Sequence, residues 1–188
     1  MRHLFFIKLN SAALVNSSTT TMGQYYYAII LDAAAKIIVW MNAFAYNSGV
    51  KLTEHSYLDN PFVNTFEFSL TPSGPYHKSR VVWAGDYADK EPGQVKNLHE
   101  QCDEYKLIRP EVKETLKYRF VVNHTKKQYA DKSKWEMHPL PLLTAEGNGR
   151  GGGDIQDAPP LIGSWARDVI SVEETLGEAE GFQEVVYE

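Results

Sequence analysis

Residues 25–41 read Tyr25-Tyr26-Tyr27-Ala28-Ile29-Ile30-Leu31-Asp32-Ala33-Ala34-Ala35-Lys36-Ile37-Ile38-Val39-Trp40-Met41. Aromatic and β-branched residues dominate both halves, which is typical of β-strands. We therefore predict a β-hairpin whose loop is residues 32–35. Because alanine is an unusual turn residue, a short helix at 32–35 is the competing interpretation.

The chain on the C-terminal side of this hairpin carries helix signals as well as strand signals. Asn60 is a good N-cap and Pro61 a good first helical residue, so we predict a helix that ends at residues 71–75. A second helix is predicted at residues 95–106. The remaining strands are predicted at residues 80–84, 118–122, 127–130, 168–172 and 182–187.

Interleaved helices and hairpins favour an α+β fold with a mainly antiparallel sheet and two or three helices. The 188 residues suit one domain, and 43% of them are hydrophobic. We place that domain at residues 22–188. Residues 1–21 contain no acid and end in a polar run, and we predict that they form an N-terminal extension.

The charge balance limits the classes of partner. The net charge is −5, so the chain lacks the basic surface that non-specific nucleic-acid binding requires. A local basic cluster is expected to be the solvated face of a hairpin rather than a phosphate-binding stripe; it comprises Lys126, Lys127, Lys132 and Lys134. No run of about 18 apolar residues is present, so no membrane span is predicted.

Cys102 is the one cysteine, so no intrachain disulfide can form, and we expect a reducing, cytoplasmic setting. His99 lies on the same face of the predicted helix, which permits a Cys–His pair. The acidic neighbours Glu100, Asp103 and Glu104 would raise the pKa of the thiol, so we favour a structural role for Cys102.

A glycine-rich segment at residues 147–153 is the main candidate ligand site. Its amides can form an anion-binding nest, and Arg150 can contact a phosphate group. The predicted ligand-binding residues are Gly147, Asn148, Gly149, Arg150, Gly151 and Asp154. The alternative is a mobile surface loop. Pro159-Pro160 excludes the dinucleotide-binding fingerprint, and the P-loop lysine is missing.

Three further residues are candidate catalytic groups: His55, Asp86 and His124. Asp86 directly follows a predicted buried strand, where functional acids are common. Together with His138 and the nearby aspartates, these residues are also candidates for a divalent-metal site. No His-x-His or His-x-x-x-His pair supports a metal, so we predict none. The cofactor, if one is needed, is unknown.

Two hydrolytic mechanisms are disfavoured by missing motifs. A two-histidine phosphodiesterase needs two His-x-Ser/Thr triplets, and only His77-Lys78-Ser79 is present. No Gly-x-Ser-x-Gly elbow of a serine hydrolase occurs.

Four strings carry a resemblance: residues 22–26, 51–56, 82–89 and 138–154, the last ending in Gly147-Asn148-Gly149-Arg150-Gly151-Gly152-Gly153-Asp154. Together they resemble a family of uncharacterised bacterial and bacteriophage proteins, over residues 22–172. The resemblance implies that residues 1–21 are an addition and that the setting is a bacterial or phage cytoplasm. It transfers no catalytic role.

Three functions remain open. The first is a site for a nucleotide or other phosphate-bearing molecule, with the glycine-rich segment and the candidate catalytic residues around one cavity. The second is a phage or host protein-interaction module, with Tyr25, Tyr27, Trp40 and Phe44 on an aromatic surface. The third is a metal-dependent hydrolase. Convergence of His55, Asp86, His124 and Arg150 favours the first or third function, and scatter favours the second.

Overall fold

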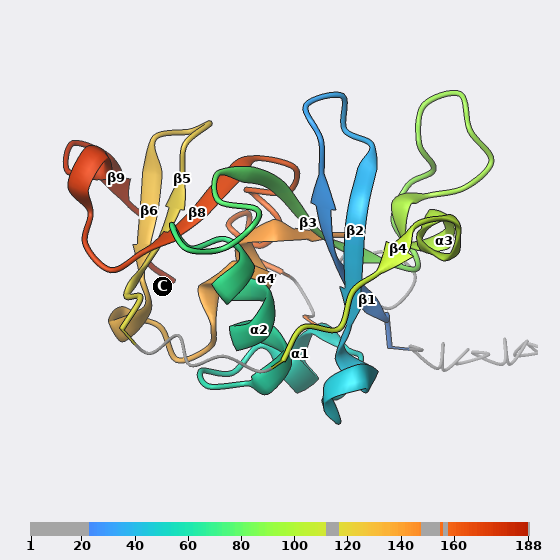
Figure 1. The fold of residues 1–188 in the computed structure, drawn as a ribbon, viewed down its shortest axis with the longest axis horizontal. Helices are drawn as coiled ribbons and strands as arrows, with labels where there is room; N and C mark the ends of the chain where they lie inside the picture. Colours follow the sequence, from blue (N-terminus) through green and yellow to red (C-terminus); the bar gives the residue numbers. More distant parts are fainter. Residues whose placement is uncertain (1–22, 112–116, 148–154, 156–157, 188) are drawn as a thin grey trace, which may run out of the picture.

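A nine-stranded sheet organises the chain in the computed structural model, which describes residues 23–111, 117–147, 155 and 158–187 (Figure 1). The strand order is β4-β2-β1-β3-β8-β5-β6-β9, with β7 paired to β3. The strands are β1 (Tyr26–Leu31), β2 (Ile37–Asn42), β3 (Ser79–Gly85), β4 (Lys106–Leu107), β5 (Phe120–Asn123), β6 (Gln128–Asp131), β7 (Ala145–Glu146), β8 (Val169–Glu173) and β9 (Gln183–Glu184).

The α+β class is confirmed, but the prediction of a mainly antiparallel sheet is wrong because the sheet is mixed. The longer strands β1, β2, β3, β5, β6 and β8 pair antiparallel with one another. The two-residue strands β4, β7 and β9 add to this framework in parallel. Strands that short carry too few residues to show the alternation from which a strand is predicted.

Four α-helices are described, where two or three were expected: α1 (Leu52–His55), α2 (Pro61–Ser69), α3 (Leu98–Gln101) and α4 (Pro139–Thr144). The predicted cap of α2 is confirmed, since the Asn60 side chain accepts hydrogen bonds from the amides of Phe62 and Val63. The helix predicted at residues 95–106 is too long. It begins after the cap at Asn97 and continues only as a 3-10 turn before the chain joins β2 as β4.

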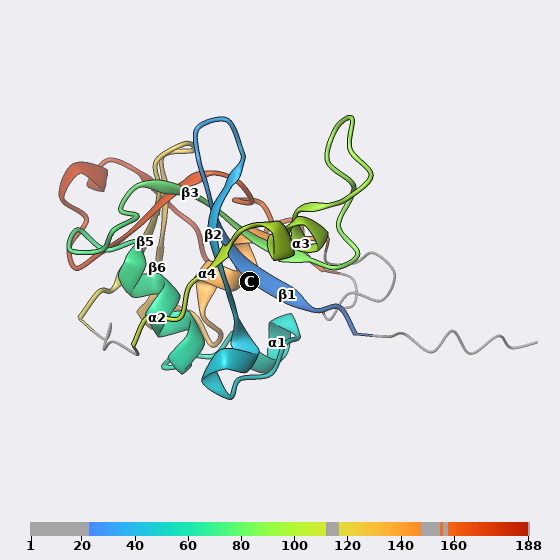
Figure 2. The same ribbon diagram turned by 45° about the vertical axis from the view of Figure 1, so that its right-hand side comes forward.

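The sheet buries side chains on both faces. Helices α1, α2 and α4 cover one face, and the main core there includes Phe66, Trp83 and Trp165, all buried. Helix α3 lies across β1 and β2 from those helices, over a smaller cluster around Trp40 and Leu98 (Figure 1, Figure 2). Within the described residues, no helix is both long and apolar enough to span a membrane.

The β1–β2 hairpin is confirmed, and Asp32 explains its alanine-rich loop. The Asp32 carboxylate accepts hydrogen bonds from the amides of Ala34 and Lys36. Ala35 takes the left-handed conformation, with φ of 60°. The side chain of one aspartate therefore supplies the turn geometry that glycine or asparagine usually provides. The N-terminal extension at residues 1–21 lies outside the described residues.

Candidate functional site

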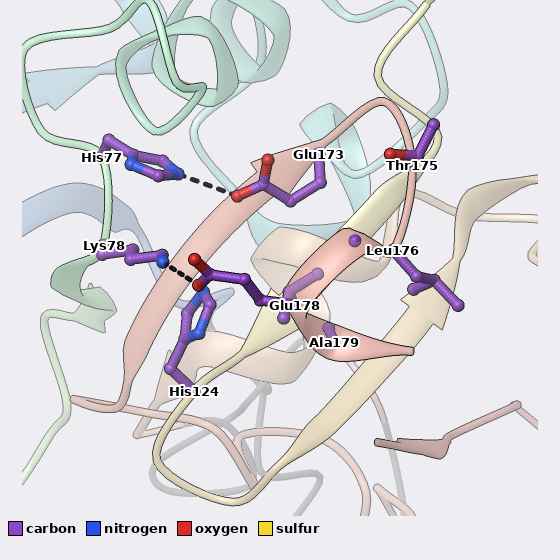
Figure 3. Close-up of a pocket in the computed structure, with 10 residues that line it drawn as sticks. His77, Lys78, His124, Glu173, Thr175, Leu176, Glu178 and Ala179 are labelled. Carbon is purple, nitrogen blue, oxygen red and sulfur yellow. Dashed lines mark hydrogen bonds and ion pairs between the residues drawn. The ribbon is translucent and has the colours of Figure 1, made fainter. Parts of the chain in front are cut away.

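A hollow of about 220 Å³ lies on the face of the sheet opposite the main core, over β8. We call it the histidine pocket. Its polar lining residues are His77, Lys78, His124, Glu173, Thr175 and Glu178 (Figure 3). The pocket forms because side chains along β8 point alternately to the two faces of the sheet. Ile170 and Val172 point into the main core, while Ser171 and Glu173 point the other way.

The two histidines lie next to the ends of the two strands that flank β8. His77 precedes β3 by two residues, and His124 directly follows β5. Because β8 pairs antiparallel with both strands, positions 77 and 124 lie on either side of it. The backbone amide of His124 donates to the carbonyl of Val169 at 2.9 Å, which fixes this end of the pocket.

Each imidazole is oriented by a neighbour on β8. The Nε2 atom of His77 lies 2.8 Å from the Glu173 carboxylate, so Nε2 carries the hydrogen and donates it. The Nε2 atom of His124 lies 2.7 Å from the Ser171 hydroxyl. Burial, then the positive charge of Lys78, lowers the pKa of His124, so its imidazole is neutral at neutral pH. Oriented imidazoles are suited to hydrogen bonding and to proton transfer.

Lys78 is the cation of the pocket, and its backbone is strained. Its φ is 56°, in the left-handed region, which costs a non-glycine residue about 1 kcal/mol. Its ammonium lies 2.7 Å from the carboxylate of Glu178, across the mouth of the pocket (Figure 3). Glu178 belongs to a 3-10 turn (Gly177–Ala179), and its side chain is 83% exposed. Lys78 holds the pKa of Glu178 below its usual value by a hydrogen bond and by its charge.

His55, a predicted catalytic residue, is instead part of the core. Its Nδ1 donates to the carbonyl of Gly49 at 2.9 Å, and its Nε2 accepts from the indole of Trp83 at 2.8 Å. Its ring also meets Phe62 edge-on. Burial lowers the pKa of His55 to about 4, outweighing its hydrogen bond to Gly49. With both ring nitrogens engaged, His55 has no atom to offer a ligand.

Asp86 and Gly147 lie at the other end of β3 from the histidine pocket. The Asp86 carboxylate accepts from the amide of Tyr25 at 3.1 Å. Gly147 has φ of 98°, and a Cβ there would come within 2.9 Å of the Ala88 backbone, so the position requires glycine. A hollow of about 370 Å³ beside Gly147 is also lined by Asp89 and Glu146.

The other predicted members of the glycine-rich site fall outside the described residues: Asn148, Gly149, Arg150, Gly151 and Asp154. The segment that precedes them is held in place by ion pairs at Glu146. Arg167 donates to the carboxylates of both Glu146 and Glu91, with contacts of 2.5 to 3.0 Å. Within the described part of the chain, no group of three or more His, Cys, Asp or Glu side chains is arranged to hold a metal ion.

The described candidates therefore do not converge, and of the aromatic residues expected at the surface Tyr25 and Phe44 are exposed but Trp40 is buried. His55 is in the core, Asp86 is at one end of β3 and His124 is at the other. Trp40 is 6% exposed and packs against Tyr27, whereas Phe44 is 79% exposed. Cys102 is buried, and burial raises the pKa of its thiol, as expected of a thiol that does not act as a nucleophile.

Sequence reasoning missed most of the histidine pocket. His77 and Lys78 were visible in the His-x-Ser triplet, which is a weak signal without a second triplet. Glu173 follows Ser171 at the two-residue spacing of a strand, which places both on one face. Glu178 carries no sequence signal. No family model, no curated protein and no solved structure matches the chain.

Proposed function

We propose that the protein binds a small phosphate-bearing molecule in the histidine pocket. The observation that carries this proposal is the pairing of Lys78 with Glu178. A carboxylate on an exposed turn already occupies the position in which an anion would meet Lys78. An exposed ion pair contributes about 0 to 1 kcal/mol, so a ligand displaces Glu178 at little cost.

The rest of the pocket supports the same ligand class. When Glu178 moves away, the ligand meets the ammonium of Lys78 and the imidazole of His124, while His77 stays hydrogen-bonded to Glu173. Phosphate oxygens are strong acceptors for charged and neutral N–H donors. A volume of about 220 Å³ is below the usual 300 to 1,000 Å³ of small-molecule sites. The pocket therefore suits a phosphate group and its nearest atoms, while the rest of the molecule lies outside.

The test is the thermal stability of the full chain in the presence of inorganic phosphate, simple phosphomonoesters and nucleotides. Ligand at about 100 times its Kd adds about 2.7 kcal/mol, which corresponds to roughly 5 to 11 °C for a chain of this size. We expect the shift to disappear in Lys78→Gln. The matched control is Lys134→Gln, which removes a similar surface ion pair with Glu184 and should keep the shift.

Two further variants locate the ligand. Glu178→Gln removes the competing carboxylate and should tighten binding of the same phosphate compound. Arg150→Ala tests the glycine-rich segment instead. A shift that survives Lys78→Gln but is lost in Arg150→Ala would move the ligand to residues 147–153. No shift with any phosphate compound would refute the proposal.

A further inference from the structure

Each imidazole of the histidine pocket keeps one ring nitrogen for a ligand. His77 uses its Nε2 atom for the contact with Glu173, and His124 uses its Nε2 atom for the contact with Ser171. Within the described residues, the Nδ1 atom of neither ring has a hydrogen-bond partner, and neither Nδ1 atom is buried. One nitrogen of each ring is therefore held by β8, and the other is available to a molecule in the pocket.

The carboxylate of Glu178 marks the place where an anion would lie relative to the two rings. Figure 3 shows the contact of Lys78 with Glu178 between the imidazoles of His77 and His124, and all four residues line the pocket. The pKa of Glu178 is lowered mainly by Lys78, and further by the charges of His124 and His77, so both rings act on this carboxylate. A phosphate group in the place of Glu178 would have a histidine on either side.

The charge of the site favours a phosphodiester over a phosphomonoester. Glu178 carries one negative charge, as a phosphodiester does, whereas a phosphomonoester carries about 1.5 to 2 at neutral pH. Glu173 stays in the pocket on His77 and would repel the additional charge. The net charge of −5 disfavours a long polyanion. A short diester therefore fits the site best.

The two rings are suited to different steps of proton transfer. Burial, then the charge of Lys78, lowers the pKa of His124, so its neutral ring can accept a proton at Nδ1 while Nε2 donates to Ser171. When His77 carries a second proton, the carboxylate of Glu173 balances its charge, and Nδ1 can donate that proton. An in-line displacement at phosphorus uses such a base and such an acid on opposite sides.

We propose that the histidine pocket cleaves short ribonucleoside phosphodiesters through their own 2′-hydroxyl group, an inference that rests on phosphate binding at Lys78. The Nδ1 atom of His124 takes the hydroxyl proton as the 2′-oxygen forms a bond to phosphorus. The bond from phosphorus to the 5′-oxygen of the leaving nucleoside breaks, and Nδ1 of His77 protonates that oxygen. Lys78 stabilises the negative charge that develops on the phosphate oxygens. The products are a cyclic phosphate and a free 5′-hydroxyl, and no other reactant is consumed.

An internal nucleophile suits the size of the pocket. A volume of about 220 Å³ holds a phosphate group and its nearest atoms, and the 2′-hydroxyl is one of those neighbours. A nucleophile that is already held beside phosphorus has a high effective concentration. The pocket therefore does not have to bind and orient a separate water molecule as well.

The missing second His-x-Ser/Thr triplet still argues against the phosphodiesterases that this motif defines. His124 is followed by Thr125 and Lys126, so only His77 belongs to a triplet. The pair of imidazoles arises instead from the register of β3 and β5 on β8, which places one histidine on either side of that strand.

The experiment follows two dinucleotides on the full chain. Cleavage of uridylyl adenosine is measured by chromatography of the cyclic phosphate, and binding of its 2′-deoxy counterpart is measured by the shift in Tm. We expect cleavage of the ribose compound alone. His124→Gln and His77→Gln should each slow cleavage at least about 100-fold, because general acid–base catalysis contributes about 10² to 10⁴. Both variants should keep most of the Tm shift, whereas Lys78→Gln should lose cleavage and shift together.

The matched control is His99→Gln, purified in the same way, which removes a histidine from α3 over β1 and β2 (Figure 1). It should cleave at the rate of the wild type. The Tm of each variant without ligand shows whether it folds, and either histidine of the pocket suffices for the test if the other variant does not fold.

The outcomes separate this inference from the proposal on which it rests. Binding of the deoxy compound without cleavage of uridylyl adenosine would overturn the inference and leave phosphate binding in place. Absence of both binding and cleavage would overturn both. Cleavage that survives both His124→Gln and His77→Gln would place the activity elsewhere, and equal cleavage of the deoxy compound would exclude attack by the 2′-hydroxyl; either result overturns the inference.

Discussion

Lowering the pH should destabilise the fold through His55, because the buried ring is held in its neutral form. Nδ1 is a donor to Gly49 and Nε2 is an acceptor from Trp83, so a second proton on the ring would break the bond to the indole. The pKa of His55 falls from 6.5 to about 4 on folding. Between these two values the unfolded chain binds the proton and the folded chain does not. Stability therefore falls as the pH falls below 6.5.

The size of the effect follows from the two pKa values. At a pH below both pKa values, the difference between them lowers the free energy of unfolding by about 3 kcal/mol. Between about pH 8 and about pH 5, the expected loss is about 2 kcal/mol. For a chain of this length, that lowers the Tm by roughly 4 to 8 °C.

The measurement is urea unfolding of the wild type and of His55→Gln across this pH range. Glutamine keeps an acceptor for Trp83 but does not titrate, and it loses the bond to Gly49. The variant should be less stable at neutral pH, and the gap should narrow by about 2 kcal/mol on acidification. Other histidines titrate in both proteins, so the difference isolates His55. Parallel stability curves for the two proteins would refute the assignment of a buried neutral ring.

Two further substitutions test the interior. Glu67→Gln should lower the free energy of unfolding in urea by about 3 to 5 kcal/mol, because it leaves the ammonium of Lys132 buried without its charge partner. Adding Lys132→Met should recover part of this loss. If the double variant recovers nothing, the two residues do not act as a buried ion pair. Gly163→Ala should lower the Tm well beyond Gly93→Ala. Both positions have positive φ, but a Cβ at Gly163 would lie 2.3 Å from the Ala145 carbonyl oxygen, whereas Gly93 faces open space. Equal falls in Tm for the two variants would show that the backbone conformation alone sets the cost.

The parts of the fold that the sequence predicts are those with a local signal. The apolar runs of β1 and β2 have the composition of strands, and Asn60-Pro61 marks the start of α2. Helix α4 lacks such a signal, because prolines at 139 and 141 suggest a loop. Its first turn forms because Pro139 needs no amide partner and His138 caps the amide of Leu140.

The histidine pocket depends on pairings between distant parts of the chain. His77 and Glu173 are 96 positions apart, and Lys78 and Glu178 are 100 apart. Only the register between β3, β5 and β8 brings these side chains together. His124 was predicted as a site residue from its own chemistry, but nothing local identifies its neighbours. His55 has the same chemistry but lies in the core. Its partner Trp83 is 28 positions away, so no local sequence signal shows that the ring is buried.

The length of β3 separates the two candidate phosphate sites. Lys78 directly precedes the strand, and Glu146, next to Gly147, pairs with Ala84 near its far end. Seven residues at about 3.3 Å each span about 20 Å, so a single phosphate group cannot reach both Lys78 and Gly147. A phosphate ligand therefore depends on Lys78 or on the glycine-rich segment. If both Lys78→Gln and Arg150→Ala weakened the same compound, either the compound would have to extend along β3 or one substitution would be acting through the fold.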